Sequence, residues 1–168
     1  LLFNNAGVNA PAVPMDELPL DKWFSVLNTN VTGVFLCARA AFGLMRRQSP
    51  QGGRIINNGS ISSQVPRPGA IAYAATKSAV TGLTRAAALD GRPFSIAVGQ
   101  IDIGNVTSDM TSKMSGGVRQ ADGSIKPEPC MDISAVVDTF MSMARLPLNA
   151  NILFTTVMAT QMPFVGRG

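Results

Sequence analysis

Apolar residues recur along residues 21–48 at the spacing of an amphipathic helix that buries one face. The positions on this face are Phe24, Leu27, Val31, Val34, Phe35, Ala38, Phe42 and Met45. Asp21 is the expected N-cap, because its carboxylate can accept hydrogen bonds from free backbone N–H groups of the first turn. Prolines at positions 11, 14 and 19 disfavour helix in the residues before it. The pattern therefore predicts one helix over residues 21–48 that packs on a sheet.

Four short apolar runs predict the strands of that sheet. They cover residues 1–3, 54–59, 94–100 and 152–157. The first run ends in a turn of small residues, and the second follows a breaker sequence of Ser, Pro, Gln and two Gly. Ligands collect at the carboxyl ends of strands in open α/β sheets, so the residues after each run are candidates for a site.

Two more helices are expected between and after these runs. Residues 73–89 are rich in Ala, Thr and Leu, and Gly91 follows as a plausible C′ residue. Asp132 is the expected N-cap of a helix that runs to about Arg145. Strands that alternate with helices favour an α/β fold with a parallel sheet.

Composition is consistent with one folded domain. The chain has 168 residues, of which 46% are hydrophobic and 14% charged, enough for a buried core. The net charge of +4 comes from basic residues that stand singly or in pairs such as Arg46 and Arg47. A nucleic-acid partner is therefore not expected.

Cysteine and histidine usage argues against a metal site. There is no histidine, and the two cysteines, Cys37 and Cys130, lie far apart in apolar contexts, so we expect two reduced, partly buried thiols and no metal. No apolar run reaches the length of a membrane span and no signal peptide is visible, so the expectation is a cytoplasmic protein without membrane contact.

Candidate chemistry centres on Tyr73 and Lys77, which stand at i and i+4 on one face of the expected helix. A cation one turn from a phenol should lower the tyrosine pKa and make a general acid or base that works near neutral pH. The spacing alone is weak, because any surface helix can carry it. Ser60, at the end of a predicted strand, could donate a hydrogen bond to a substrate carbonyl, and Ser62 and Ser63 compete for that role.

Three further segments occur in order around this pair: Asn-Asn-Ala-Gly at residues 4–7, Asn-Thr-Asn-Val-Thr-Gly at 28–33 and Arg-Ile-Ile-Asn-Asn-Gly-Ser at 54–60. Together with Tyr-x-x-x-Lys they resemble the classical short-chain dehydrogenase/reductase family. The resemblance implies a partial Rossmann-like, doubly wound parallel sheet that lacks the first strands and the glycine-rich turn. No Gly-x-x-x-Gly-x-Gly occurs in the chain. Residues 1–168 would then be a single incomplete NAD(P)-binding domain, an N-terminally truncated fragment.

The resemblance also implies roles for particular residues. The catalytic set would be Asn30, Ser60, Tyr73 and Lys77, with Ser60 chosen because the family places its serine thirteen positions before the tyrosine. Asn30 would hold a water of a proton relay through its backbone, and the alternative is an asparagine satisfied locally.

The cofactor would be held, by the same resemblance, by Asn5, Ala6, Gly7, Tyr73, Lys77, Ile103 and Thr107. The chain departs from the family after the third run, where Ile101 and Asp102 stand in place of the usual Pro-Gly. Asp102 could instead be only a turn residue.

The function implied is an oxidoreductase that uses NAD or NADP on a small carbonyl or alcohol substrate and assembles as a homo-dimer or homo-tetramer when complete. Residues 107–129, which have no persistent period, would form a lid over the substrate, with Met110 and Met114 as possible contacts. The alternative is a non-catalytic fragment that has lost cofactor binding and has at most a structural or dimerisation role.

Overall fold

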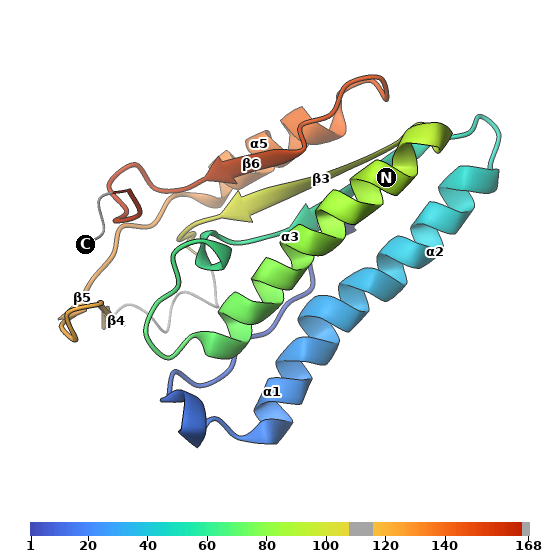
Figure 1. Cartoon of the computed structure of the whole chain (residues 1–168). Helices are drawn as coiled ribbons and strands as arrows, with labels where there is room; N and C mark the ends of the chain where they lie inside the picture. The colour runs from blue at the N-terminus through green and yellow to red at the C-terminus, as the bar shows by residue number, and fades with distance from the viewer. Residues whose placement is uncertain (108–115, 166–168) are drawn as a thin grey trace.

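A four-stranded parallel sheet forms the centre of the molecule (Figure 1). The computed structural model describes residues 1–107 and 116–165. The strands are β1 (Leu2–Asn4), β2 (Gly53–Asn58), β3 (Ile96–Ile103) and β6 (Phe154–Val157), in the order β1-β2-β3-β6. Because all four run in one direction, their carboxyl ends lie along one edge, as in other open α/β sheets.

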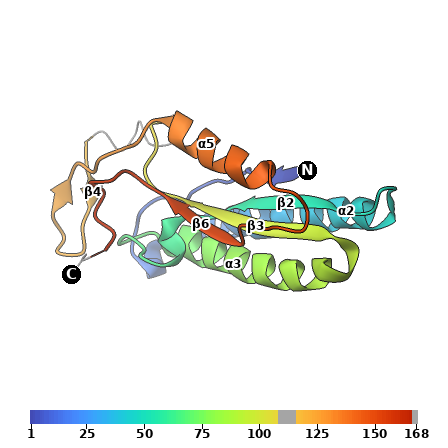
Figure 2. The same cartoon turned by 90° about the horizontal axis from the view of Figure 1, so that it is seen from above.

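Helices cover both faces of this sheet (Figure 2). One face carries α1 (Leu20–Leu27), α2 (Val34–Arg47) and α3 (Ile71–Gly91), and the other carries α5 (Ile133–Ala144). Short 3-10 helices lie at Met15–Glu17, Ile61–Ser63 and Arg92–Phe94. This arrangement confirms the α/β, doubly wound architecture expected from the sequence.

The core has one apolar layer on each side of the sheet. Ile55 of β2 packs with Met45, Ile96 and Val98 on the side of α2 and α3. The next residue, Ile56, packs with residues of α5 on the opposite side. Successive side chains of a strand point to opposite faces, so a strand covered on both sides is apolar without interruption.

The helix predicted over residues 21–48 is divided. It begins at Leu20 with Pro19 as its N-cap, so the assignment of Asp21 as N-cap is wrong. Proline at this position has φ of −61°, and its missing N–H is not needed there. Asp21 lies in the first turn, where a carboxylate still interacts favourably with the helix dipole. A π-helix over Asn28–Gly33 separates α1 from α2.

The tyrosine helix is longer at both ends than predicted. α3 starts at Ile71 and includes Gly91, whose φ of −75° is helical, so Gly91 is not a C′ residue. The chain continues directly into a 3-10 helix, and Ser95 takes the left-handed conformation at φ 55°. Asp132 is the N-cap of α5 as predicted, since its side chain accepts a hydrogen bond of 2.8 Å from the Ser134 backbone N–H.

The segment from 96 to 129 differs most from expectation. β3 continues to Ile103, and Asp102 pairs with Thr156 of β6 and is buried, so its interpretation as a turn residue is wrong. Beyond it, β4 (Val118–Arg119) and β5 (Ile125–Lys126) form an antiparallel hairpin. A strand of two residues is too short to show a hydrophobic period, so neither β4 nor β5 was expected from the amino-acid pattern.

Both cysteines are exposed, so the expectation of partly buried thiols is wrong. Cys37 lies on α2 beside Phe35 and Leu36, which are also exposed. Apolar neighbours in the sequence therefore did not indicate burial on this helix. Across residues 1–107 and 116–165, no helix combines the length and the apolar character needed to cross a membrane.

Candidate active site

The turn after β1 lies at the carboxyl edge of the sheet and is tied to β2 by asparagine side chains. Asn4 donates a hydrogen bond of 2.8 Å to Asn57, and Asn58 donates one of 2.9 Å to Asn5. A Cβ placed on Gly7 would lie 3.5 Å from Oδ1 of Asn30 and 3.9 Å from Nζ of Lys77. Asn5, Ala6 and Gly7 therefore border the residues expected to be catalytic.

Asn30 is buried inside the π-helix and its side chain is fully engaged. Oδ1 accepts a hydrogen bond of 2.9 Å from the Val8 N–H, while Nδ2 donates to Val8 O at 2.9 Å and to Thr76 Oγ1 at 3.1 Å. The side chain thus joins the turn after β1 to α3, through partners 22 and 46 positions away and not through the local hydrogen bonds considered as the alternative. Its backbone lies in a π-helical turn, a feature that is frequent at functional sites.

Ser60 follows β2 and is buried, and its hydroxyl is near enough to the Tyr73 phenol to act on the pKa of that phenol, lowering it. Its Oγ also accepts a hydrogen bond of 3.1 Å from the Ser62 N–H, which fixes the position of the hydroxyl. Ser63 instead uses its hydroxyl to donate to the Ser60 carbonyl at 2.7 Å. Of the three candidate serines, Ser60 is the one whose hydroxyl acts on the pKa of the tyrosine.

Lys77 is 4% exposed, and its ammonium donates a hydrogen bond of 2.7 Å to the Asn58 carbonyl at the end of β2. The ammonium lies 5.5 Å from the centre of the Tyr73 ring. Burial lowers the pKa of Lys77 to about 8, and the negative charge of Asp102 opposes that shift. The lysine is thus a cation that loses its proton just above neutrality.

Tyr73 shows the opposite direction from the one predicted. Burial raises its pKa above the ordinary value, although the hydrogen bond from Ser60 and the positive charge of Arg67 act to lower it. The sequence argument considered the cation one turn away and not the removal of the phenol from water, which disfavours the phenolate.

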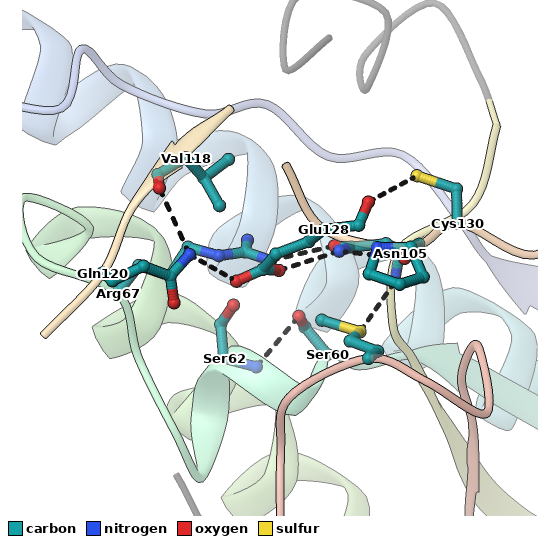
Figure 3. Close-up of polar contacts among 10 residues, drawn as sticks. Ser60, Ser62, Arg67, Asn105, Val118, Gln120, Glu128 and Cys130 are labelled. Atoms are coloured by element: carbon teal, nitrogen blue, oxygen red, sulfur yellow. Dashed lines mark hydrogen bonds and ion pairs between the residues drawn. The ribbon is translucent and has the colours of Figure 1, made fainter. Parts of the chain in front are cut away.

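Arg67 joins the loop before α3 to the segment around the hairpin (Figure 3). Its guanidinium forms an ion pair with Glu128 and donates a hydrogen bond of 2.9 Å to Asn105. Glu128, whose side chain is 2% exposed, also accepts hydrogen bonds from Asn105 at 2.9 Å and Gln120 at 3.0 Å. Burial acts to raise the Glu128 pKa, and these donors outweigh it, so the pKa lies below the ordinary value.

This cluster of polar side chains was not predicted from the amino-acid pattern. Its members, Arg67, Asn105, Gln120 and Glu128, share no motif and are separated by up to sixty-one positions. They meet because the loop before α3 and the residues after β3 both leave the same edge of the sheet.

The two residues expected at the nicotinamide have different surroundings. Ile103 is half-buried at the end of β3 and pairs with Val157. Thr107 is exposed, and its N–H donates a hydrogen bond of 3.1 Å to Met131 O. Met110 and Met114 lie outside the described residues, as does part of the expected lid.

The structure therefore brings Asn30, Ser60, Tyr73 and Lys77 together where β1 and β2 end. A phenol, a neighbouring hydroxyl and a buried ammonium form a set that can deliver a proton to a carbonyl oxygen or remove one from an alcohol. The profile of a family described as short chain dehydrogenase matches residues 1–118. The chain belongs to this family. Its order of motifs is thus that of a short chain dehydrogenase, as the resemblance implied.

Relatives of this short chain dehydrogenase act on different molecules. A 3-oxoacyl-(acyl-carrier-protein) reductase FabG from Staphylococcus aureus is 37% identical over 120 residues, which are 71% of this chain and 48% of the relative. A 3beta-hydroxysteroid dehydrogenase from Mediterraneibacter gnavus is 34% identical over 116 residues, 69% of this chain and 41% of the relative. The chain spans about half the length of these relatives or less.

A solved structure of a 3-oxoacyl-(acyl-carrier protein) reductase with bound NAD, from Brucella melitensis, is also similar to this short chain dehydrogenase. The two superpose with a TM-score of 0.72 at 25% identity, over 92% of this chain and 59% of the other.

Proposed function

We propose that the protein containing this chain is a nicotinamide-dependent oxidoreductase that interconverts a carbonyl and an alcohol, with Tyr73 as general acid for reduction and general base for oxidation. The observation that carries the proposal is the buried Lys77 ammonium, 5.5 Å from the centre of the half-buried Tyr73 ring, with the Ser60 hydroxyl near enough to act on the pKa of the phenol. Ser60 would position the substrate carbonyl, and Lys77 would stabilise the phenolate as it forms.

The residues present fit the nicotinamide ribose half of NAD or NADP. The ammonium of Lys77 and the turn around Gly7 are close together at the carboxyl edge, where a donor can hold a ribose hydroxyl and a residue without a side chain lets a ligand approach. When bound, the cofactor supplies or accepts the hydride. Asn5, Ala6, Ile103 and Thr107 are proposed as further cofactor contacts, and the Asn30 backbone as part of the proton relay.

We also propose that these 168 residues alone bind NAD or NADP weakly and turn over no substrate. The sequence contains no Gly-x-x-x-Gly-x-Gly turn, the element that would hold the cofactor pyrophosphate at a helix N-terminus. The activity would then belong to a longer protein in which residues outside this chain complete the site.

Substitution of Tyr73 by Phe tests the proposed activity in the native protein. The phenyl ring keeps its packing and its proximity to Lys77, and only the transferable proton is lost. We expect kcat to fall by about 10²- to 10⁴-fold in NADH or NADPH oxidation with a 3-oxoacyl thioester or a 3-ketosteroid, the substrate classes of the relatives. Unchanged turnover in Tyr73→Phe would overturn the assignment of the general acid.

Two neighbouring serines provide a matched control. Ser60→Ala removes the hydroxyl that acts on the pKa of Tyr73 and should lower kcat by about 10²-fold. Ser62→Ala keeps the backbone N–H that holds Ser60 and should leave kcat within about threefold of the parent. Equal losses in the two variants would contradict the role of Ser60.

A further inference from the structure

Asp102 is a buried carboxylate that the proposed chemistry does not yet use. It lies on β3 and is 3% exposed. Its Oδ1 accepts a hydrogen bond of 2.7 Å from Gln100, and Oδ2 accepts one of 3.4 Å from Gln64. A buried carboxylate with donors on both oxygens is held in one orientation.

The carboxylate packs directly against the backbone that leads into Ser60. A Cβ placed on Gly59 would lie 2.0 Å from Oδ1 of Asp102, closer than any side chain could be. The Gly59 N–H donates a hydrogen bond of 2.8 Å to the carbonyl of Ile101, one residue before Asp102. The position of Ser60 is therefore set by two contacts with β3, one from the strand backbone and one from the Asp102 side chain.

A neutral network holds Gln100 so that it donates to Asp102. The amide oxygen of Gln100 accepts a hydrogen bond of 3.0 Å from Thr84, and the amide nitrogen donates to Thr81 at 3.0 Å and to Asp102. Thr84 in turn accepts a hydrogen bond of 2.9 Å from Asn57. Because the orientation of the amide is determined by these partners, Gln100 presents an N–H to the carboxylate.

Asp102 also interacts with the charges on α3. Lys77 lies against the same short segment of backbone: its ammonium donates a hydrogen bond of 2.7 Å to the carbonyl of Asn58, the residue before Gly59, against which the Asp102 carboxylate packs. The negative charge of Asp102 acts to raise the pKa of Lys77 against the larger effect of burial, and burial raises the pKa of Asp102 itself while the Lys77 charge acts to lower it. Arg85 of α3 lines the same groove as Asp102, and the positive charge of Arg67 in the preceding loop acts on Tyr73. Among these charged groups Asp102 is the one that favours a protonated Lys77.

We propose that Asp102 is a positioning residue of this site, which packs against the backbone that leads into Ser60 and serves as counter-charge to the Lys77 ammonium. The inference rests on the proposed function of Ser60, Tyr73 and Lys77. On this proposal, the Asp102 carboxylate of β3 favours the protonated form of Lys77, although the lysine side chain is almost completely out of water. Without that charge the ammonium would be desolvated with only neutral partners, a situation that favours the free amine.

The test compares Asp102→Asn with Thr84→Val in the native protein. Asp102→Asn keeps the shape and removes the charge, so Lys77 should lose its proton at lower pH, and the alkaline limb of the kcat profile should move down by about one pH unit. Thr84→Val disrupts the same network, from a fully buried position, without changing any charge. It should lower the melting temperature and leave the limb in place. An unshifted limb in Asp102→Asn, or equal shifts in both variants, would overturn the proposal.

A second pair of variants keeps Asp102 and is expected to fold in any case. Gln64 is exposed and lies 3.4 Å from the carboxylate, so Gln64→Lys places a cation beside Asp102 and Gln64→Met serves as the neutral control. Side-chain ¹⁵N NMR of lysine follows the Lys77 titration directly and needs no turnover. Gln64→Lys should lower the Lys77 titration midpoint relative to Gln64→Met, and identical midpoints would contradict the proposal. If Tyr73→Phe stays active while these midpoints shift, the proposed function fails and the charge coupling stands.

Discussion

Lys77 carries its positive charge in a buried position, and burial disfavours the charged form. Its side chain is 4% exposed, and burial lowers its pKa to about 8 from 10.5. A shift of this size corresponds to about 3 kcal/mol by which folding disfavours the protonated lysine at neutral pH. A methionine of similar length would avoid this penalty, so the lysine is better explained by chemistry than by stability.

Stability should therefore rise with pH in a window set by Lys77. Between pH 8 and 10 the unfolded chain keeps the lysine proton that the folded chain has lost, so the free energy of unfolding increases. Above pH 10 the raised pKa of Tyr73 reverses the trend, because the folded state then holds the extra proton. Urea unfolding of the chain across pH 7–10 measures the slope.

Two lysine variants separate this effect from a general pH response. Lys77→Met should be more stable than the parent at pH 7 and should lose most of the slope between pH 8 and 10. Lys22→Met, at a lysine whose side chain is 55% exposed, should retain the slope. A parent protein without a slope, or one whose slope survives in Lys77→Met, would show that the buried lysine does not titrate as described.

At the scale of elements, the carboxyl edge is assembled from segments that contact each other through polar side chains. Asn30 joins the π-helix to the turn after β1 and to α3, and Arg67 joins the loop before α3 to Glu128 beyond β5. Each contact replaces hydrogen bonds to water by hydrogen bonds within the protein, and in each case the donors and acceptors come from different elements. Loss of one partner leaves the other buried without compensation.

The segment around the hairpin should loosen when Glu128 is neutralised. Glu128→Gln keeps the shape and removes the negative charge, so the Arg67 cation and two amide donors lose their charged acceptor at a cost of about 2 kcal/mol. Hydrogen exchange followed by mass spectrometry should become faster at residues 118–128 and remain unchanged in β2 and β3. Glu17→Gln makes the same change at an exposed glutamate of the 3-10 helix Met15–Glu17, so it is the matched control and should leave exchange at residues 118–128 as in the parent.

Acid should have a similar effect in the parent protein. The pKa of Glu128 is lowered by folding, so its contribution is present above the ordinary glutamate value and is lost as the pH falls through the lowered one. Glu128→Gln should show less acid-dependent exchange at residues 118–128 than the parent. If the variant and the parent respond equally to acid, the ion pair does not hold the segment.

At the scale of the whole molecule, a parallel sheet between two helical layers places the ends of β1, β2 and β3 on one edge (Figure 2). The proposed catalytic groups all lie at that edge. In the proposed function they would hold the nicotinamide half of a dinucleotide, and none of them would hold its pyrophosphate. We therefore expect residues outside this chain to supply the pyrophosphate contacts.

The 168-residue chain should therefore show no saturable binding of NADH or NADPH at concentrations up to about 1 mM, since the pyrophosphate contacts that supply much of the affinity come from a glycine-rich turn. Isothermal titration calorimetry on the purified chain measures this directly, with the native protein as positive control. Saturable binding together with turnover that Tyr73→Phe abolishes would contradict the prediction.

Sequence reasoning succeeded where the signal was local. Ile55 and Ile56 lie in a buried strand, Asp132 caps a helix, and Ser60, Tyr73 and Lys77 meet at one place as their spacing suggested. It failed where a residue's environment depends on distant segments. A turn role for Asp102 stayed open in the sequence because the strand that pairs with it begins fifty-two positions later, at Phe154.

The sequence by itself determined the family, the α/β layering and the residues proposed for proton transfer, because periodicity, capping and motif spacing are properties of neighbouring residues. Only the tertiary structure decided the direction of the Tyr73 pKa, the charge partner of Lys77 and the partners of Arg67. Burial and electrostatic interaction are sums over everything that surrounds a group in space. For groups at the edge of a parallel sheet, those surroundings come from every strand that ends there.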